Sequence, residues 1–341
     1  MKKAESYLIQ IMYKKKGRIN MSNKNLIGNT PMIKLKYKYK EKIGRVYCKL
    51  ESYNLTGSIK DRVANYIILN AKKEGKLKEK MPIIEATSGN TGISLAALGA
   101  YYNHPVYIFM PDWASEERIK LMKLYGAKVK LISKEDGGFL RCIKEANKLS
   151  QEINGFLTKQ FENKDNVLAH YETTGKEIIE QLPNKIGGFI SGVGTGGTLI
   201  GIGKRLKEKF NDIKICALEP ERMPIISKGK IIGQHKIEGI GDDFVPELYD
   251  EKLIDEVFLI NDEDAINMSR KLSKELGLGV GISSGANLIG AIKLEDKIKK
   301  EVVIVFPDDN KKYLSTDLVQ NMNNSSNLLS NNVELLNYEV I

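Results

Sequence analysis

The strongest constraint on the fold is an alternation of short apolar runs with longer amphipathic stretches between about Asn25 and Asp317. Eight apolar runs have the length of strands, and helical patterns lie between them. The strand candidates are residues 45–51, 82–87, 105–110, 127–132, 187–192, 213–219, 255–260 and 301–306. The helix candidates include residues 62–75, 91–102, 115–126 and 262–277. Strands separated by helices are typical of parallel sheets with crossover helices, so the sequence predicts an α/β architecture with enough units for two sheets.

The composition is that of a globular chain with a core of its own. The chain has 341 residues, of which 42% are hydrophobic and 28% charged, and these values are ordinary for globular domains. No apolar run approaches the roughly 20 residues that are needed to cross a bilayer. The first residues are basic but lack the apolar stretch of a signal peptide. We therefore expect a cytoplasmic protein that does not enter a membrane.

Both ends of the chain lie outside the alternating pattern. Residues 1–20 are expected to be an N-terminal extension, with Met12 or Met21 as alternative starts. The residues after Asp317 are rich in Asn and Ser and show little periodicity. This composition predicts a mobile tail, or one short docking helix at most.

Charge, cysteine and histidine usage exclude several classes of function. The net charge is +10, but each lysine-rich run also contains Glu or Asp and none is interleaved with aromatic residues. This pattern favours a solvated surface over a nucleic-acid interface, although an anionic ligand would benefit from the positive field. Cys48, Cys142 and Cys216 are far apart and fit reduced, packed thiols. No cysteine or histidine has the spacing of a metal ligand, so we expect no metal site.

A glycine-rich segment, "GGFISGVGTGGTLIG", follows one predicted strand and opens a helix. Free backbone N–H groups at such a helix start form a cradle for phosphate. Gly192, Gly194 and Gly197 also fit the dinucleotide pattern GxGxxG, and Glu219 lies where a ribose-binding acid is expected. A nicotinamide-dependent dehydrogenase and a tight turn without ligand are therefore both open at this point.

The segment "NLTGSIKDRVANYI" places Lys60 where a loop passes into a helix. A lysine at a helix N-terminus is opposed by the helix dipole unless an anionic group lies near it. The alternative is an ordinary surface lysine, which is the commoner case.

Two further turns carry hydroxyl and amide groups into helices. In "IIEATSGNTGISLAAL" the polar groups belong to Thr87, Ser88, Asn90 and Thr91, and they suit a bound carboxylate or simply an N-cap. The segment "LGVGISSGANLIGAI" has the same arrangement, with the hydroxyls of Ser283 and Ser284 where a helix begins.

Taken together, these segments resemble the cysteine synthase and cystathionine β-synthase family of pyridoxal-phosphate enzymes. The motifs "TGSIKDR", "ATSGNTGI", "HYETTGKEI", "GVGTGGTLIG" and "GISSGAN" occur in the order found in that family, and "NLIGNTPMIKL" is similar to its N-terminal signature. The resemblance runs from about Asn25 to Pro307. A dehydrogenase leaves Lys60 and the Ser-Gly-Asn-Thr-Gly loop unexplained and becomes a remote alternative. A non-catalytic ligand-binding relative is the other alternative of a different class.

The resemblance implies a fold and a ligand set. It implies two doubly wound domains with parallel-rich sheets and the cofactor, pyridoxal 5'-phosphate, in the cleft between them, as in the β subunit of tryptophan synthase. The large domain would comprise residues 21–53 and 165–317. The small domain would comprise residues 54–164, with a part near 105–150 that closes over substrate, and residues 318–341 would be the tail. Small amino-acid substrates and a homodimer are implied as well, with no nucleic acid.

The family's roles carry over to matching positions of this chain. Lys60 would hold the cofactor as a Schiff base and move the Cα proton. Asn90 would bond the ring oxygen of the cofactor and contact the substrate. Ser283, or Ser284 beside it, would face the pyridine nitrogen, and Glu219 would be part of a strand end. The phosphate would lie on Gly194, Thr195, Gly196, Gly197 and Thr198. The substrate carboxylate would lie on Thr87, Ser88, Thr91 and Gln160.

A serine at the pyridine nitrogen carries a chemical consequence. A neutral serine does not hold a proton on that nitrogen as an aspartate would, so the carbanion is less delocalised and the β-substituent leaves promptly. The cofactor supplies the electron sink, and the protein supplies orientation and proton transfer. The resemblance therefore implies exchange of the β-substituent by way of an α-aminoacrylate.

The segment "IEGIGDDFVPELYDE" distinguishes this chain within the family. Cysteine synthases that use O-acetylserine typically read Gly-Ile-Gly-Ala-Gly-Phe here, whereas this chain reads "GIGDDF". Cystathionine β-synthases are more similar, because an acid precedes their Phe as Asp243 does here. Asp242 matches neither group.

Leaving-group chemistry suggests a use for the acid. Hydroxide is a poor leaving group and water a poor nucleophile, so making or breaking a β-hydroxyl needs a positioned acid or base. A pair of solvent-facing loop charges is the alternative. We expect Asp243 to be catalytic and to contact substrate, and we favour conversion of L-cysteine to hydrogen sulfide with addition of water to give L-serine. Cysteine synthesis from sulfide with O-acetylserine or serine, and a condensation like that of cystathionine β-synthase, remain open.

Overall fold

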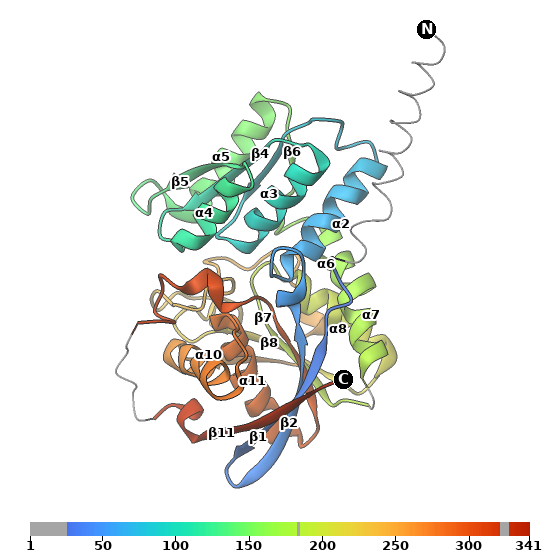
Figure 1. Ribbon diagram of the computed structural model, residues 1–341, viewed down its shortest axis with the longest axis vertical. Coiled ribbons are helices and arrows are strands. Elements are labelled where there is room, and N and C mark those ends of the chain that lie inside the picture. Colours follow the sequence, from blue (N-terminus) through green and yellow to red (C-terminus); the bar gives the residue numbers. More distant parts are fainter. Residues whose placement is uncertain (1–25, 183–184, 321–326) are drawn as a thin grey trace.

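The computed structural model describes residues 26–182, 185–320 and 327–341, which form two sheets flanked by helices (Figure 1). One sheet has seven strands in the order β11-β1-β2-β10-β7-β8-β9, and the other has four in the order β5-β4-β3-β6. The strands are β1 (Met32–Tyr39), β2 (Lys42–Leu50), β3 (Ile83–Ala86), β4 (Val106–Pro111), β5 (Lys128–Ile132), β6 (Phe156–Leu157), β7 (Gly188–Gly192), β8 (Lys214–Pro220), β9 (Glu256–Ile260), β10 (Val302–Phe306) and β11 (Val333–Val340).

Helices cover both sheets. Figure 1 shows α2 to α5 around the four-stranded sheet, and it shows α7 and α8 on one side of the seven-stranded sheet with α10 and α11 on the other. The α-helices are α2 (Lys60–Lys73), α3 (Asn90–Tyr102), α4 (Glu116–Leu124), α5 (Gly138–Glu152), α6 (Lys164–Ala169), α7 (Gly175–Gln181), α8 (Gly197–Lys209), α9 (Ile225–Lys228), α10 (Asp262–Leu276) and α11 (Ile282–Ile298). The shorter helical segments are η2 (Glu51–Tyr53), the π-helical η3 (His170–Thr174), η4 (Glu251–Leu253), η5 (Asn310–Tyr313) and η6 (Leu329–Asn332). In the described part, no helix is both long enough and apolar enough to span a membrane.

The predicted α/β architecture is confirmed. Each of the eight strand candidates forms a strand, and the four helix candidates form α2, α3, α4 and α10. The strands from β2 to β9 in the large sheet are mutually parallel, as are all strands of the small sheet. Parallel neighbours require crossover connections, and these connections are the helices.

The central strands β10, β7 and β8 of the large sheet are buried on both faces. Neighbouring residues of β7 point to opposite sides, so Phe189 belongs to the same buried cluster as Leu199 of α8, whereas Ile190 belongs to the cluster that contains Leu294 of α11. Runs that are apolar on both faces are what a parallel sheet between two helix layers requires. This explains why the central strand candidates read as continuous apolar runs rather than as alternating patterns.

The two sheets use different parts of the chain. The four-stranded sheet takes its strands from residues 83–157, and the seven-stranded sheet takes its strands from both sides of that segment. The domain boundaries that the family resemblance implies, and the mobility near 105–150, stay predictions. The proposed extension at residues 1–20 lies outside the described residues.

The end of the chain corrects one expectation. The strand β11 pairs antiparallel with β1, from Ile33 opposite Val340 to Tyr39 opposite Val333. Val333 and Leu335 at its start are buried against the core, with the exposed Glu334 between them, as in a strand with one covered face. The prediction of a mobile tail or a docking helix is therefore wrong for residues 333–340.

A buried ion network fastens α2 to α7 and to the end of β2. Arg62 donates from Nε to Glu51 Oε2 at 2.6 Å and from Nη1 to Glu177 Oε1 at 2.6 Å. Lys49 Nζ lies 2.9 Å from Glu177 Oε2. Burial raises the pKa of Glu177, but Arg62 and then Lys49 outweigh that effect and lower it to about 2. Each charge in the network is therefore paired.

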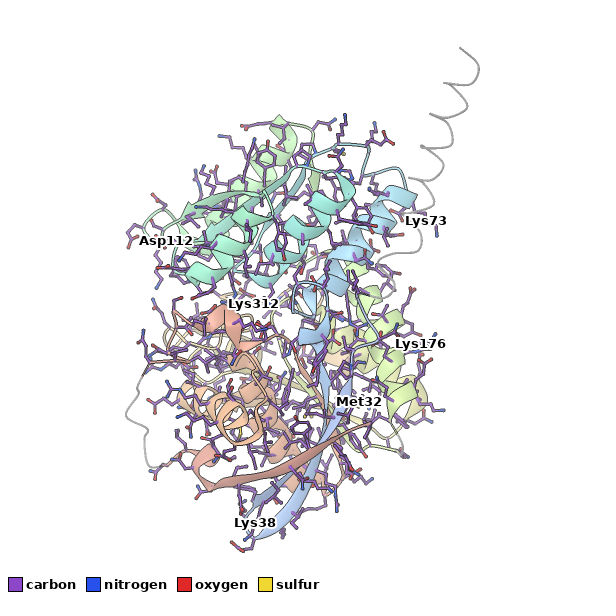
Figure 2. All side chains as sticks on the ribbon, viewed as in Figure 1. Met32, Lys38, Lys73, Asp112, Lys176 and Lys312 are labelled. Carbon is purple, nitrogen blue, oxygen red and sulfur yellow. The ribbon has the colours of Figure 1, made fainter. Side chains whose placement is uncertain are left out.

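We expect Arg62→Leu to lower the free energy of unfolding by roughly 3–5 kcal/mol, because it leaves the buried Glu51 without a cationic partner and Glu177 with Lys49 alone. Since the pKa of Glu177 is lowered from 4.5 to about 2, its stabilisation is complete above that range and declines as the pH falls through it. Urea unfolding between pH 3.5 and 7 should show this decline in the wild type and a smaller one in Arg62→Leu. The control is Lys176→Leu on the outer face of α7 (Figure 2), where the exposed pair with Glu180 is worth at most about 1 kcal/mol. Equal losses in both variants would contradict the prediction.

Candidate active site

The carboxyl ends of strands from both sheets face one cavity of about 920 Å³. The loops after β3, β7 and β10 line it, as do the first turns of α2, α3, α8 and α11. Ligands of open α/β folds bind at this edge of a sheet, where loops and helix N-termini converge. The cavity is therefore the candidate active site.

The structure brings nearly all of the predicted site residues to this cavity. Two residues, Gly197 and Ser284, do not line the cavity. The Oγ of Ser284 is buried and has no partner among the described residues. The predicted residues that line the cavity are Lys60, Thr87, Ser88, Asn90, Thr91, Gln160, Gly194, Thr195, Gly196, Thr198, Asp242, Asp243 and Ser283. Four separate helix starts therefore contribute to one site.

Lys60 is the first residue of α2 and lines the cavity wall. Burial lowers the pKa of Lys60 to about 8, and the negative charges of Asp242 and Asp308 only partly oppose that effect. A fall from 10.5 to about 8 makes the neutral amine roughly 300 times more abundant at neutral pH than on an exposed lysine. Such an amine is suited to attack a carbonyl group and to take up a proton.

The loop after β3 is fixed by hydrogen bonds to the strand β6 region. Thr91 Oγ1 donates to Gln160 Oε1 at 2.6 Å, and Gln160 Nε2 donates to the carbonyl of Ala86 at 2.8 Å. Glu85, which is buried, accepts from Gln160 N and from Thr158 Oγ1. The hydroxyls and first-turn N–H groups at the start of α3 are thereby held toward the cavity, in an arrangement that suits a carboxylate.

The glycine turn between β7 and α8 approaches other backbone too closely for side chains. A Cβ on Gly194 would lie 2.4 Å from the carbonyl oxygen of Gly239, and Gly196 has a φ of +85°. The first-turn N–H groups of α8 have no partner within the helix, and this turn presents them to the cavity. The geometry fits a phosphate group.

His170 lies behind that turn and was not predicted as a site residue. It is fully buried in the π-helical segment η3, with Nε2 3.2 Å from Thr198 Oγ1 and Nδ1 3.0 Å from Thr174 Oγ1. Burial, with the nearby charges of Lys60 and Arg62, lowers the pKa of His170 well below its ordinary value. His170 is thus a neutral hydrogen-bonding support for Thr198. Its presence in the motif "HYETTGKEI" was the available signal.

Glu219 has a structural role that removes the main support for a dehydrogenase. Its carboxylate accepts from Ile226 N at 2.8 Å and from Ser227 N at 3.0 Å, at the start of α9. It is buried and does not line the cavity. The predicted position at a strand end is therefore correct, and no ribose-binding role is needed.

The acid pair lies on a loop that is tied to the glycine turn. Gly241 N donates to the carbonyl of Val193 at 2.9 Å, and His235 Nε2 lies 2.7 Å from the carbonyl of Gly241. Burial raises the pKa of Asp242 to about 6, the charge of Asp243 adds to this, and the charge of Lys60 opposes it. Asp242 is therefore the member of the pair that interacts electrostatically with the lysine.

Sequence reasoning also missed two residues that connect the two sheets at the cavity. Arg118 of α4 is buried and forms an ion pair with Glu238. Its Cζ lies over the ring of Tyr313, 4.4 Å from the ring centre. Asp308, which follows β10, accepts a hydrogen bond from Asn90. Both are charged residues in loops or on helices that carried no motif, so their sequence context gave no signal.

These features define a class of protein: an α/β fold in which a lysine amine of lowered pKa, a loop of Ser, Thr and Asn residues and a glycine turn at a helix start line one cavity. The turn at Gly194, which approaches the Gly239 backbone too closely for a Cβ, and the first-turn N–H groups of α8 fit a phosphorylated ligand at this site. The buried Oδ1 of Asn90, which has no partner among the described residues, is an acceptor available to a ligand donor.

Comparisons with known proteins agree with this class. The family model described as "Pyridoxal-phosphate dependent enzyme" matches residues 24–308. A probable cysteine synthase of Bacillus subtilis (strain 168) is 41% identical over 307 residues, which cover 88% of this chain and 98% of that protein. The crystal structure of a hydrogen sulfide-producing enzyme from Fusobacterium nucleatum is 48% identical with a TM-score of 0.89, covering 93% of this chain and 98% of that one. A cysteine synthase from Entamoeba histolytica is 38% identical with a TM-score of 0.82, covering 91% and 94%.

The chain belongs to the pyridoxal-phosphate dependent enzyme family. It is an enzyme of the cysteine synthase type that acts on sulfur amino acids, and its cofactor is pyridoxal phosphate. The family resemblance that the sequence motifs indicated is therefore confirmed.

Proposed function

We propose that the protein converts L-cysteine and water to L-serine and hydrogen sulfide. The C–S bond at the β-carbon breaks, sulfur leaves as hydrosulfide, and the oxygen of water takes its place, so the atoms balance without an oxidant or reductant. The observation that carries the proposal is Asp242, a carboxyl in the cavity wall whose pKa of about 6 lies close to neutrality and whose charge interacts with Lys60.

The cavity residues support the binding steps of this reaction. Lys60 would hold the aldehyde carbon of the cofactor, and the turn from Gly194 to Thr198 would hold its phosphate. Bound in this way, pyridoxal phosphate acts as an electron sink for the substrate's Cα. Asn90 and Ser283 would contact the ring. The loop of Thr87, Ser88 and Thr91, with Gln160, would hold the substrate carboxylate.

The acid supports the choice of water as the entering group. Water is a poor nucleophile, so it needs a base that is ionised near neutral pH and lies beside the β-carbon. A carboxylate with a pKa of about 6 is ionised at neutral pH and is a stronger base than that of an exposed aspartate. The sequence favoured Asp243, but the charge interaction with Lys60 favours Asp242 as the working base, with Asp243 raising its pKa.

Relatives support this choice in part. The name of the Fusobacterium nucleatum enzyme states that it produces hydrogen sulfide, and an Asp-to-Asn mutant of it, 49% identical to this chain, was crystallised with an α-aminoacrylate intermediate. Capture of that intermediate in such a mutant is what we expect if an aspartate acts in the addition of water. The cysteine synthase relatives support the reaction of O-acetylserine or serine with sulfide as the second candidate.

The test is to incubate the enzyme with L-cysteine alone and to measure sulfide and amino-acid products. Sulfide with an equal amount of L-serine is the expected result. If sulfide appears with pyruvate, or with the thioether that forms when a second cysteine adds in place of water, the proposal that water is the entering nucleophile is wrong. No reaction with cysteine, together with cysteine formation from O-acetylserine and sulfide, would establish the second candidate instead.

We expect Gly194→Ala to weaken cofactor binding by about 10- to 100-fold. The added Cβ would lie 2.4 Å from Gly239 O, and moving either backbone costs roughly 1–3 kcal/mol. Cofactor titration followed by visible absorbance measures the effect. Gly233→Ala is the matched control, because a Cβ there meets no atom within 4 Å. Unchanged affinity in Gly194→Ala would exclude this turn as the phosphate site.

A further inference from the structure

Asp308 lies between the two sheets and has no role in the reaction proposed above. It follows the last residue of β10 by two positions and is buried, with 1% of its surface exposed. Its backbone forms an isolated bridge with Ser58, two residues before Lys60. Figure 2 shows Lys312, which follows closely in the chain, at the junction between the two parts of the molecule. Asp308 is therefore part of the large sheet's contribution to the cavity region.

A single oxygen of Asp308 makes all of its close polar contacts. Oδ2 accepts from Asn90 Nδ2 at 2.7 Å and from Tyr313 Oη at 2.8 Å, and Arg118 Nη2 lies 3.9 Å away. Oδ1 is buried and has no partner among the described residues. It lies where a Cβ on Gly281 would approach within 2.0 Å, so that position must be glycine for the carboxylate to fit.

These contacts fix the amide of Asn90. An ionised carboxylate can only accept hydrogen bonds, so Asn90 must turn its NH₂ group toward Asp308. One N–H of Asn90 is then used, the second stays free to donate, and Oδ1 of Asn90 is buried without a partner among the described residues. Asn90 belongs to α3 beside the small sheet and Asp308 to the large sheet's side, so the bond joins the two sides of the cavity.

The same carboxylate acts on the lysine. The charges of Asp242 and Asp308 are the two that favour the protonated form of Lys60 against burial. Arg118 and the hydroxyl of Tyr313 also contact Asp308. Asp308 therefore acts on Lys60 as a buried negative charge, and Asp242 is the other acid whose charge acts on Lys60.

We propose that Asp308 is a positioning residue that orients the Asn90 amide across the cavity and supplies a fixed negative charge that acts on Lys60. It acts on the cofactor only through those two residues. The inference rests on the proposed function, because it assigns Asn90 and Lys60 to the cofactor.

Two variants separate the two effects. Asp308→Asn can keep its amide oxygen where Oδ2 lies, so the bonds from Asn90 and Tyr313 persist while the charge is lost. Asp308→Ala removes both the bonds and the charge. Asp309→Asn is the matched control, since that neighbouring carboxylate accepts from Lys311 N and does not contact Asn90. The holoenzyme is assayed as sulfide release from L-cysteine, which does not depend on which nucleophile enters afterwards.

In Asp308→Asn, the limb of the kcat–pH profile that Lys60 sets, when its amine is free in the enzyme–substrate complex, should move to lower pH by about half to one unit, because a negative charge that favours protonated lysine is lost. The circular dichroism of the bound cofactor should stay as in the wild type. In Asp308→Ala, the pH shift should be joined by about tenfold faster cofactor release and an altered dichroism band, since the Asn90 amide is no longer held. Hydrogen exchange of residues 87–95 should also rise in this variant.

A profile of Asp308→Asn that coincides with that of the wild type and Asp309→Asn would overturn the charge role. An Asp308→Ala variant that loses only thermal stability, with unchanged dichroism and hydrogen exchange, would overturn the orienting role. If Asp308→Ala does not fold, the near-isosteric Asp308→Asn still decides the charge role. Formation of pyruvate instead of serine would reject the proposed function but leave the shift in sulfide release measurable, so the two failures are distinguishable.

Discussion

Replacing Lys60 with alanine should abolish the Schiff-base absorbance of the enzyme and lower sulfide release by about 10³-fold or more. The lysine is expected to act both as the nucleophile that holds the cofactor and as the base at Cα, and a positioned base alone contributes roughly 10²–10⁴-fold. Its amine is prepared for this by burial, which lowers the pKa of Lys60 to about 8. Visible spectra and steady-state assays of the purified variant measure both effects.

The control for this prediction lies on the same helix. Lys73 is the last residue of α2, exposed at the periphery of the molecule (Figure 2), and Lys73→Ala should leave the spectrum and the rate unchanged. Retention of the absorbance band in Lys60→Ala would mean that a different lysine holds the cofactor. Lys134 and Lys236, which also line the cavity, would then be the candidates.

Replacing Asp242 with asparagine should lower serine formation by about 10²–10³-fold while sulfide release falls much less. The amide cannot take a proton from water, but departure of hydrosulfide needs little proton help, since a free cysteine thiol ordinarily has a pKa of about 8.5. The intermediate between the two steps should therefore accumulate or decay to pyruvate. Amino-acid analysis and a coupled pyruvate assay on the same sample measure the partition.

Asp243→Asn distinguishes the two acids. In this variant the pKa of Asp242 should fall below about 6, because a neighbouring negative charge is lost. The pH at which serine formation declines should fall with it, while the rate at neutral pH changes little. The opposite result, in which Asp243→Asn loses serine and Asp242→Asn does not, would assign the base to Asp243 as the sequence comparison suggested.

The central part of the fold could be predicted from sequence because the responsible interactions are local. Buried parallel strands such as residues 302–306 are continuous apolar runs, and residues 262–277 follow the helical period expected of a helix that packs on one face. The strand β1 and its hairpin with β2 were missed because the turn places Lys40 and Glu41 at positive φ, without the Gly or Asn that usually marks such turns. The strand β11 was missed because its partner lies some 300 residues earlier in the chain.

The candidate site also has a part that the sequence could predict and a part that it could not. Each predicted turn follows a strand or opens a helix, and parallel topology brings such turns to one edge. Asp308 could not be found from the sequence, because its role depends on Asn90 and Tyr313, which only the fold brings together. The choice between Asp242 and Asp243 could not be made either. Two adjacent aspartates in a loop differ only in where their side chains point, and the sequence does not give this. Burial near Lys60 distinguishes them, and burial is a property of the folded chain.

The backbone contact between Gly194 and Gly239 has a consequence for how new specificities could arise in this scaffold. Gly239 precedes the acid pair by three residues, and Gly241 is bonded to Val193 at the start of the glycine turn. The loop that is expected to select the entering nucleophile is thus held by the loop that is expected to hold the phosphate, and a substitution at position 242 or 243 leaves that support intact. One cofactor site can therefore serve several β-exchange reactions, with divergence confined to a pair of side chains on a support that stays the same.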